Sequence, residues 1–515
     1  MDARPRSTNA HPARAGRNTV TPDDPRYDEL LQRNFNKRFM GKPDYVHLVD
    51  SSEQVVQAVQ AAVERGLRVV ARSGGCCLEG FVADPKVRVV IDTSLMTEVA
   101  YDPELAAIAI EPGVTLGEAY QKLFLGWGVT LPAGQSPYIG MGGHVMGGGH
   151  SFLSRQHGML VDHLYAVEVV FVDQSGTARR VVATREPADP NRELWWAHTG
   201  AGGGNFGIVT RYWFRSPNAS DTLAPLPQAP SSVTTFKAEW DWKRMSEAAV
   251  KRLLANYGDW CERNGAIDSP FTALYGVLTL ARPACGGKIE ARGMVVAGAE
   301  SERLLDQHLA AVNQGVGVGH TREVAHSSWL DFALNPLPEV FATQPGGVAS
   351  SKARFKLKDA FSRKRHSDRQ LAVLYEYLVN GPNDIAGGIG LATFAGRVNA
   401  VAPDATAYVH RDSSISTSYS VGWQNPDDEA RSLDWLRRFY RDVFADTGGV
   451  PVPGEVSNGA TINHPDVDLA DPEWNTSGVP WHTLYFKDNY PRLQRAKLRW
   501  DPRNVFHHAL SIRLP

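Results

Sequence analysis

Residues 132–150 read PAGQSPYIGMGGHVMGGGH, and seven glycines fall between Gly134 and Gly149. A plain loop does not need so many glycines. Their missing side chains allow the backbone to lie against a large flat ligand with its N–H groups turned toward it. The stretch is neither the GxGxxG of a Rossmann site nor the GxxxxGK[ST] of a P-loop, so neither of these nucleotide sites is supported.

Two further glycine-rich strings lie on either side of this stretch. Residues 72–81 read RSGGCCLEGF directly after a predicted strand, and residues 200–210 read GAGGGNFGIVT before another one. Paired glycines let backbone amides wrap an anion such as a pyrophosphate, and Arg72 would add charge. The first string alone could equally be a tight turn between two strands. Three such loops in one chain predict one extended cofactor.

The sequence around these strings predicts an α+β fold. Before a proline-rich boundary near 217–232, apolar periodicity and a Ser51/Gln54 capping box predict a helix ending at Gly66, a second helix over 115–127, and strands over 67–71, 87–91, 105–110 and 164–172. After it, strands over 272–280 and 288–296 with a helix over 301–312 predict an antiparallel sheet with helices on one face. A basic helix is expected over 491–499.

Composition excludes several classes of protein. With 515 residues the chain is long enough for two domains, and its formal net charge of −2, without blocks of like charge, argues against nucleic-acid or membrane-surface partners. We find no signal peptide, membrane span or metal-binding spacing. Four cysteines without a CxxC pair favour a reducing, cytoplasmic setting.

The three strings and the carboxy-terminal NYPRLQRAKLRWDPRNVFHH of residues 489–508 together resemble the FAD-linked oxidases that include berberine bridge enzyme and share the vanillyl-alcohol-oxidase-type fold. Within this family the chain is similar to bacterial antibiotic-biosynthesis oxidases such as glycopeptide hexose oxidases. The resemblance implies a two-subdomain PCMH-type FAD-binding domain, from residues 27–217 and 455–515, and a substrate-binding domain over 218–454. Residues 1–26 are expected to be a flexible amino-terminal segment.

The family's motifs, carried onto this sequence, imply the residues that bind FAD. They lie in the three strings and at the start of the carboxy-terminal motif: Arg72, Ser73, Gly74, Gly75, Cys76, Cys77, Gly80, Ser136, Gly140, Gly142, Gly143, His144, Gly147, Gly148, Gly204, Asn205, Phe206, Gly207, Ile208, Val209 and Asn489.

Two residues depart from the family where relatives attach the flavin covalently. Relatives carry a flavin-linked His and Cys at the positions of Cys76 and Ser136, which are 60 residues apart, as expected for two attachment points on one flavin. Ser136 cannot form the usual thioether. Cys76 could form a single link if its thiolate is accessible, and a small buried thiol beside the ring is the alternative. We expect noncovalent FAD, and the two substitutions can be natural or engineered.

The family's catalytic tyrosines are also replaced. Thr461 and Phe394 stand at two often-tyrosine positions. His464, with an ordinary pKa near 6.5, could accept the substrate proton, or it is a loop residue bonded to the backbone. Tyr138 and Tyr165 are further catalytic candidates.

A segment near residue 410 offers possible substrate contacts. His410 and Arg411 could bind a polyhydroxylated or anionic ligand, while a plain ion pair between Arg411 and Asp412 is the simpler interpretation.

These features predict an FAD-dependent oxidase. A hydroxyl or amine carbon of a specialised metabolite, for example a sugar of a glycosylated antibiotic, would pass hydride to flavin N5, and dioxygen would reoxidise the cofactor. The expected partners are a small natural product and dioxygen, and the sequence leaves the oligomeric state open. The alternatives are an FAD-binding cyclase without redox chemistry and a flavin-attachment variant of an oxidase.

Overall fold

The computed structural model describes residues 18–217, 219, 225–336 and 354–515. The first nine strands are β1 (Thr19–Val20), β2 (Tyr45–Leu48), β3 (Val69–Arg72), β4 (Val89–Asp92), β5 (Val99–Asp102), β6 (Ala107–Ile110), β7 (Leu164–Val172), β8 (Ala178–Thr184) and β9 (Ile208–Phe214). They form two sheets, ordered β1-β2-β4-β3 and β5-β6-β9-β7-β8.

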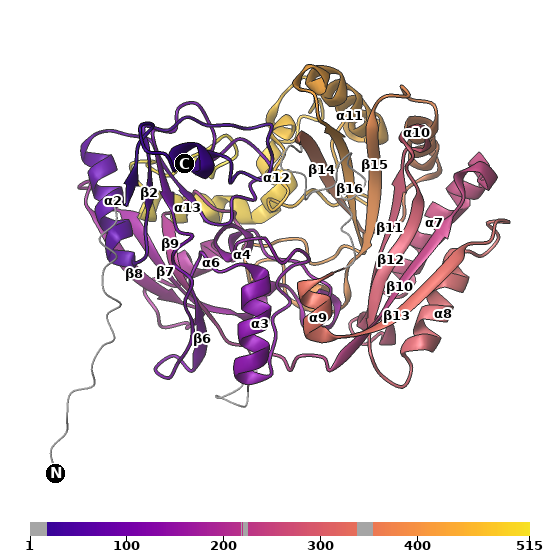
Figure 1. The fold of residues 1–515 in the computed structure, drawn as a ribbon, viewed down its shortest axis with the longest axis horizontal. Helices are drawn as coiled ribbons and strands as arrows, with labels where there is room; N and C mark the ends of the chain where they lie inside the picture. The colour runs from indigo at the N-terminus through magenta and orange to yellow at the C-terminus, as the bar shows by residue number, and fades with distance from the viewer. Residues whose placement is uncertain (1–17, 218, 220–224, 337–353) are drawn as a thin grey trace, which may run out of the picture.

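The remaining strands form one larger sheet, which occupies the other half of the molecule (Figure 1). They are β10 (Ser232–Trp240), β11 (Leu274–Ala281), β12 (Ile289–Val296), β13 (Thr321–Ser328), β14 (Arg354–Ser362), β15 (Ala386–Thr393) and β16 (Ile415–Trp423). The sheet is antiparallel throughout, in the order β13-β10-β12-β11-β15-β16-β14. The predicted α+β class and antiparallel second sheet are confirmed.

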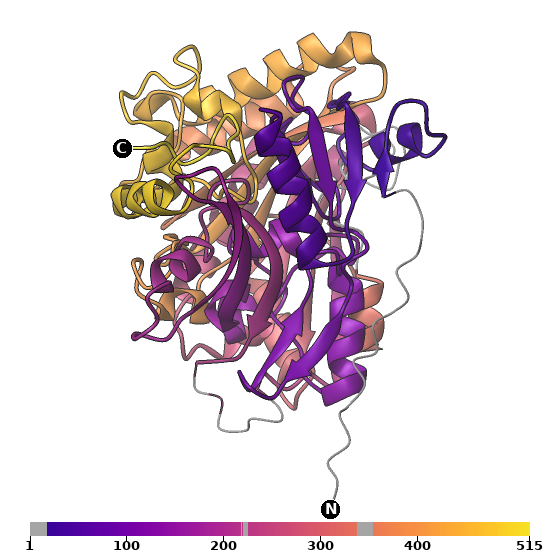
Figure 2. The same ribbon diagram turned by 90° about the vertical axis from the view of Figure 1, so that its left-hand side faces the viewer.

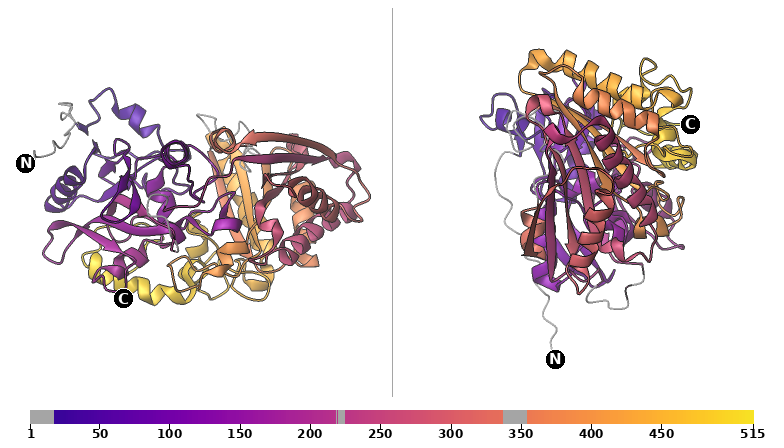
Figure 3. Two further views of the ribbon diagram at one scale, coloured as in Figure 1. Left: turned by 90° about the horizontal axis from the view of Figure 1, so that it is seen from below. Right: turned by 90° about the vertical axis from the view of Figure 1, so that its right-hand side faces the viewer.

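Helices cover one face of this larger sheet and leave the other turned toward the first half (Figures 1 and 3). The covering helices are α7 (Glu247–Arg263), α8 (Ser301–Val312), α10 (Asp368–Val379) and α11 (Glu429–Val443). The others are α1 (Tyr27–Leu31), α2 (Ser52–Glu64), α3 (Leu116–Trp127), α4 (Met141–Met146), α5 (Ser154–His157), α6 (Arg192–Ala197), α9 (Trp329–Leu334), α12 (Trp481–Phe486) and α13 (Tyr490–Trp500). No helix in the described ranges is long and apolar enough to cross a membrane.

The local sequence signals explain where several helices begin. The Ser51 side chain accepts a hydrogen bond from the Gln54 N–H at the start of α2, but the Gln54 side chain bonds to the Asp50 N–H, so the predicted capping box is only half formed. Thr115 and Glu118 form a complete capping box at α3. The predicted strand over 164–172 and helix over 301–312 match β7 and α8 at both ends.

The amino-terminal segment is more ordered than expected. Thr19–Val20 pairs with β2, so the part of the predicted flexible segment from residue 18 onward is folded onto the first sheet, while residues 1–17 lie outside the described residues. At the other end, α13 returns to the first half, where it lies beside α6 (Figure 2).

Candidate active site

The first glycine-rich string begins where β3 ends. The Arg72 guanidinium, 3 % exposed, pairs with the Asp92 carboxylate at 2.7 Å and donates to the Leu30 carbonyl oxygen. Its charge is therefore neutralised within the protein. The expectation that Arg72 supplies charge to a bound anion is corrected, because burial beside Asp92 commits this side chain to holding the base of the loop.

The glycines of the first string permit close contact with the second. A Cβ on Gly74 would lie 2.5 Å from the Gly140 nitrogen, and one on Gly75, whose φ is +76°, would lie 2.4 Å from the Arg33 carbonyl oxygen. Neither position accepts a side chain without a backbone shift. The first string can touch the second only because residue 74 is glycine, and Gly75 lets the same loop pass close to Arg33.

The second string meets the carboxy-terminal loop. A Cβ on Gly147 would lie 1.9 Å from the Asn463 side-chain oxygen, and the Asn463 amide donates to the His144 carbonyl oxygen at 3.2 Å. The Gly202 N–H of the third string donates to the Met146 carbonyl oxygen at 2.8 Å. His144 and Asn463, which are 319 positions apart in the sequence, are therefore neighbours in the fold.

The carboxy-terminal motif joins the third string to the first. Lys497, fully buried, donates to the Asn205 carbonyl oxygen at 2.7 Å. The His508 ring stacks on Phe81 with centroids 4.1 Å apart, and its Nε2 lies 3.0 Å from the Gly203 carbonyl oxygen. All three strings therefore converge, which is the arrangement that one extended cofactor requires.

Close contacts between the loops explain why most of these positions must be glycine. Cβ atoms on Gly148 and Gly200 would collide with Tyr408, and one on Gly202 with Ile462, whereas Gly143 has open space around it. The interpretation that the missing side chains make room for a ligand is therefore too broad. Their main effect is to let the loops lie close enough together to form a site.

Backbone donors in the first string fit the diphosphate of FAD. Among the described residues, the N–H groups of Gly74 and Gly75 have no acceptor within the protein, and they follow a strand of a parallel ladder. Successive unpaired N–H groups form a concave site that suits an anion. These two residues would hold the diphosphate.

Three histidines interact where the second string meets the carboxy-terminal loop. Burial, with a smaller contribution from the nearby His144, lowers the pKa of His464 to about 4 and that of His150 to about 3. His464 Nδ1 and His150 Nε2 are buried and have no partner in the described parts of the chain. Both imidazoles are therefore neutral at pH 7. His464 is a weaker base than its ordinary pKa suggests, but it can still accept a proton.

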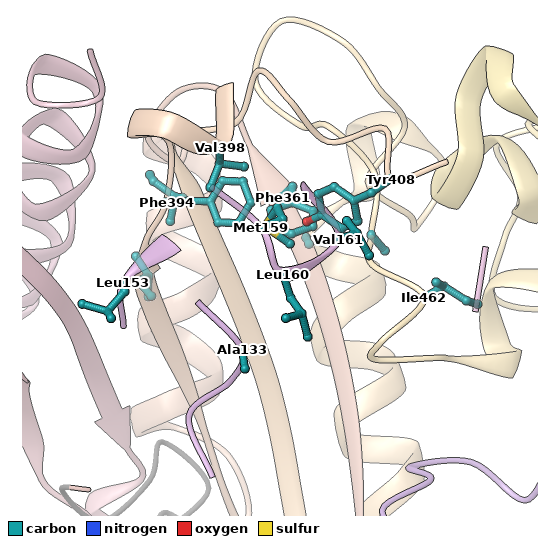
Figure 4. Close-up of a cluster of buried hydrophobic side chains, with 14 of the residues drawn as sticks. Ala133, Leu153, Met159, Leu160, Val161, Phe361, Phe394, Val398, Tyr408 and Ile462 are labelled. Carbon is teal, nitrogen blue, oxygen red and sulfur yellow. The ribbon is translucent and has the colours of Figure 1, made fainter. Parts of the chain in front are cut away.

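The larger sheet supplies an aromatic wall beside these histidines. The His150 ring lies 4.9 Å from that of Phe394, which lies 4.8 Å from that of Phe361, and Figure 4 shows the two phenylalanines in a cluster of buried apolar side chains. Tyr275 on β11 accepts a hydrogen bond from the Gln135 amide at 2.6 Å. A neutral base beside an apolar wall is suited to removing a proton from a bound hydroxyl.

The two candidate attachment positions lie on adjacent loops. Cys76 Sγ is 3.9 Å from the Tyr138 carbonyl oxygen, two residues beyond Ser136, which is 9 % exposed. The Tyr138 side chain is 80 % exposed. Burial raises the pKa of the neighbouring Cys77 thiol to about 11.

Tyr165 does not join the histidines. Its ring packs with Trp213 and small residues of β6 and β7 in a separate apolar cluster, and the Arg215 guanidinium lies 3.7 Å from the ring centroid. The structure therefore gives Tyr165 a packing role on the five-stranded sheet and places no substrate-facing tyrosine there.

Two asparagines from the FAD-binding prediction bond to backbone. The Asn205 amide donates to the carbonyl oxygens of Ala201 and Gly202 at 3.0 Å, and the Asn489 amide donates to those of Pro403 and Thr406. Both side chains shape loops. The adjoining Phe206 is 1 % exposed and buried in the core.

The predicted ion pair between Arg411 and Asp412 is wrong. Arg411 instead pairs with Asp162 at 2.6 Å, and Asp412 pairs with Arg363 at 2.8 Å, because the two side chains diverge from an irregular segment. His410 is 1 % exposed and packs between aromatic rings, so it is not free to contact a ligand.

Sequence reasoning missed a buried ion network. Lys356 and Lys358 on β14 pair with Asp466, and Lys356 also pairs with Glu79 of the first string. Asp468 pairs with Lys358, and all five side chains are 2 % exposed. Two lysines on the same side of the strand RFKLKDAFS were a visible signal, since lysine is rarely buried without a partner.

Comparison with known proteins identifies two family models in this chain. The model described as FAD binding domain matches residues 43–181, and the model described as berberine and berberine like matches residues 460–513. The first includes the first two glycine strings and the second includes the carboxy-terminal motif.

Relatives match almost the whole chain. Aclacinomycin-N/aclacinomycin-A oxidase of Streptomyces galilaeus is 49 % identical, with 96 % of this chain and 89 % of the relative covered. The structure of glycopeptide hexose oxidase DBV29 complexed with teicoplanin is 49 % identical with a TM-score of 0.91, over 96 % of this chain and 98 % of that one. The structure of aclacinomycin oxidoreductase is 48 % identical with a TM-score of 0.92, over 96 % and 99 %.

Proposed function

Because this chain belongs to the berberine bridge enzyme-like family and is an FAD-dependent oxidase, we propose that it oxidises a hydroxyl or amine carbon on the sugar of a glycosylated natural product. The relatives named above include a hexose oxidase and an aclacinomycin oxidase, which supports a sugar-bearing metabolite as the substrate. Dioxygen is the proposed second substrate. The observation that carries the proposal is a neutral, unpartnered His464 where the glycine strings meet the larger sheet.

The protein's own residues bind and orient, while FAD supplies the redox chemistry. Bound FAD would supply the hydride acceptor, at N5, and the transfer of the electrons to dioxygen. In our proposal Gly74 and Gly75 hold the diphosphate, the wall containing Phe394 excludes water, and His464 takes the proton of the substrate O–H at Nδ1.

Anaerobic mixing with glycosylated natural products tests this proposal. We expect the visible absorbance of oxidised flavin to bleach as substrate is consumed, and to return when air is admitted. The control is the aglycone of the same compound, which should leave the flavin oxidised. Turnover of a substrate with no bleaching would contradict the proposal and identify a cyclisation without redox chemistry.

We propose that the flavin is noncovalent, with one link through Cys76 as the alternative. Acid precipitation should release FAD from the wild-type protein, because Ser136 lacks a thiol. The pair Cys76→His and Ser136→Cys should keep the flavin in the pellet, since the loops of residues 76 and 136 are adjacent. Peptide mass spectrometry is the measurement.

The control for this prediction is Cys76→Ala. If the wild-type protein is linked through Cys76, this variant alone will release flavin that the wild type retains. A flavin mass on the peptide that contains Ser136 in the wild-type protein would contradict the proposal.

We also propose the division into FAD-binding parts over 27–217 and 455–515 and a substrate domain over 218–454. It is supported by the seven-stranded sheet, whose strands all lie between residues 232 and 423. A reducing cytoplasmic setting remains part of the proposal, and none of the four cysteines is in a disulfide.

A further inference from the structure

One row of residues crosses four strands on the open face of the larger sheet. Asp359 on β14 is opposite Ser418 on β16, Ser418 is opposite Gly390 on β15, and Gly390 is opposite Thr279 on β11. Paired residues point to the same side of a sheet. Tyr275 lies on this side of β11, two residues before Val277 and four before Thr279, and it contacts the second glycine string, so the row faces the candidate active site.

The middle of this row has small, partly exposed side chains. Thr279 and Ser418 are half-buried, and Gly390 between them has no side chain. The row spans three strand intervals, roughly 14 Å, which is long enough for a sugar attached to another ring. Asp359 lies at one end of the row, and its protonation state decides which ligands the row can bind.

Asp359 is buried, and only one of its two carboxyl oxygens has a hydrogen-bond partner among the described residues. It is 2 % exposed, and its Oδ2 accepts the Thr461 N–H at 3.1 Å. Its Oδ1 is buried and has no partner in the described part of the structure. A polar atom in this state normally has a partner, from the protein, from water or from a ligand.

Among the residues that the structure describes, no cation pairs with Asp359. The ion network behind β14 is balanced within itself, with Lys356, Lys358 and Arg437 against Glu79, Asp466 and Asp468. The Lys358 ammonium lies over the Tyr440 ring of α11, on the opposite face of the strand from Asp359.

The titratable groups around Asp359 also disfavour its charged form. Within the described ranges, those that interact with it are Asp466 and the phenols of Tyr408, Tyr419, Tyr440 and Tyr485, and none of these is cationic. Burial, with a smaller contribution from Asp466, holds the pKa of Asp359 well above its usual range. A neutral carboxyl has one O–H donor, and since Oδ2 accepts from Thr461, that donor is on Oδ1.

We propose that Asp359 is a protonated hydrogen-bond donor that binds an uncharged, oxygen-rich part of the substrate, such as a sugar hydroxyl or ring oxygen lying along the Thr279–Gly390–Ser418 row. This inference rests on the proposed function and specifies its substrate-binding surface. The carboxyl donates from Oδ1 and loses no proton, so Asp359 is a binding residue and not the base.

Two substitutions at Asp359 test the proposal by kinetics. Asp359→Asn keeps a neutral donor and an acceptor in the same positions, so KM and the flavin-reduction rate should change by less than about threefold. Asp359→Leu removes the donor, and KM should rise by about ten- to a hundredfold while bound FAD is unchanged. Thr417→Val is the matched control, since this buried hydroxyl on the helix-covered face of β16 is also unpartnered and should leave KM unchanged.

A rise in KM in Asp359→Asn as large as that in Asp359→Leu would overturn the proposal, because it would show that the ionised carboxylate is needed. An unchanged KM in Asp359→Leu would overturn it as well. Both outcomes leave the bleaching test of the proposed function intact.

Infrared spectroscopy tests the protonation state without any substrate. The difference between wild type and Asp359→Asn at pH 7 should contain the C=O stretch of a protonated carboxylic acid. A carboxylate signal in its place would overturn the proposal. Its outcome does not depend on whether the protein oxidises a sugar.

Thermal stability gives a second substrate-free measurement. Because the folded pKa of Asp359 is raised, the wild type loses stability as pH rises from the unfolded value near 4 toward the folded one, whereas Asp359→Asn does not. The Tm of the variant relative to wild type should therefore increase between pH 5 and pH 8. A constant or decreasing difference would contradict a protonated Asp359.

Discussion

Replacing His464 by Gln should lower the rate of flavin reduction by about two to four orders of magnitude at saturating substrate. Glutamine preserves size and hydrogen bonding but cannot take a proton. Because burial lowers the His464 pKa to about 4, the imidazole is unprotonated above that pH, and the wild-type rate should fall only as pH drops through about 4. Stopped-flow spectroscopy under anaerobic conditions measures both effects.

The control for this experiment is His163→Gln. His163 is also buried, but it contacts the Ser216 side chain and the His157 carbonyl oxygen, far in sequence from the carboxy-terminal loop and without a role in our mechanism. In this variant the rate of flavin reduction should fall at the same acidic pH as in the wild type. A normal reduction rate in His464→Gln would show that another group takes the proton, with the exposed Tyr138 as the next candidate.

Replacing Lys356 by Met should destabilise the protein by about 3–5 kcal/mol and weaken FAD binding. The lysine bonds Glu79, three residues beyond Cys76, and Asp466, two residues beyond His464, so its loss leaves two buried carboxylates without their shared cation. We expect the first glycine string and the carboxy-terminal loop to separate. Chemical denaturation and the fraction of FAD retained on gel filtration are the measurements.

Lys237→Met provides the matched control on the same sheet. This lysine contacts three carboxylates. Its side chain is 25 % exposed, so the charges stay in contact with water. Its loss should cost at most about 1 kcal/mol and leave FAD binding unchanged. Equal effects of the two substitutions would show that the buried network does not join the two loops.

The local elements of this fold could be predicted because their signals lie within a few residues. Apolar periodicity located β7 and α8, and the Thr115 capping box marks the start of α3. Three glycine strings predicted one extended cofactor, because such patterns suit close backbone approach to an anion, and the resemblance to FAD-linked oxidases identified it as FAD. In each case the physical cause acts over one turn of helix or one strand.

The site itself depended on pairings that the linear sequence does not display. Arg72 was expected to bind an anion but is committed to Asp92, and Arg411 pairs with Asp162 and not with its neighbour Asp412. Ion-pair choice depends on which side chains share a buried space, and that space forms only when distant segments pack.

By itself the sequence determined several strands and helices and the need for one extended cofactor, since these depend on residue type and short spacing, while the resemblance to FAD-linked oxidases identified FAD and the replaced attachment and tyrosine positions. Tertiary structure alone decided that His464 is neutral well below pH 6, that Tyr165 packs away from the three histidines, and that Asp359 has no counterion among the described residues. The physical reason is that protonation and hydrogen-bond partnership are set by burial and by charges from other segments, which folding brings together over hundreds of residues.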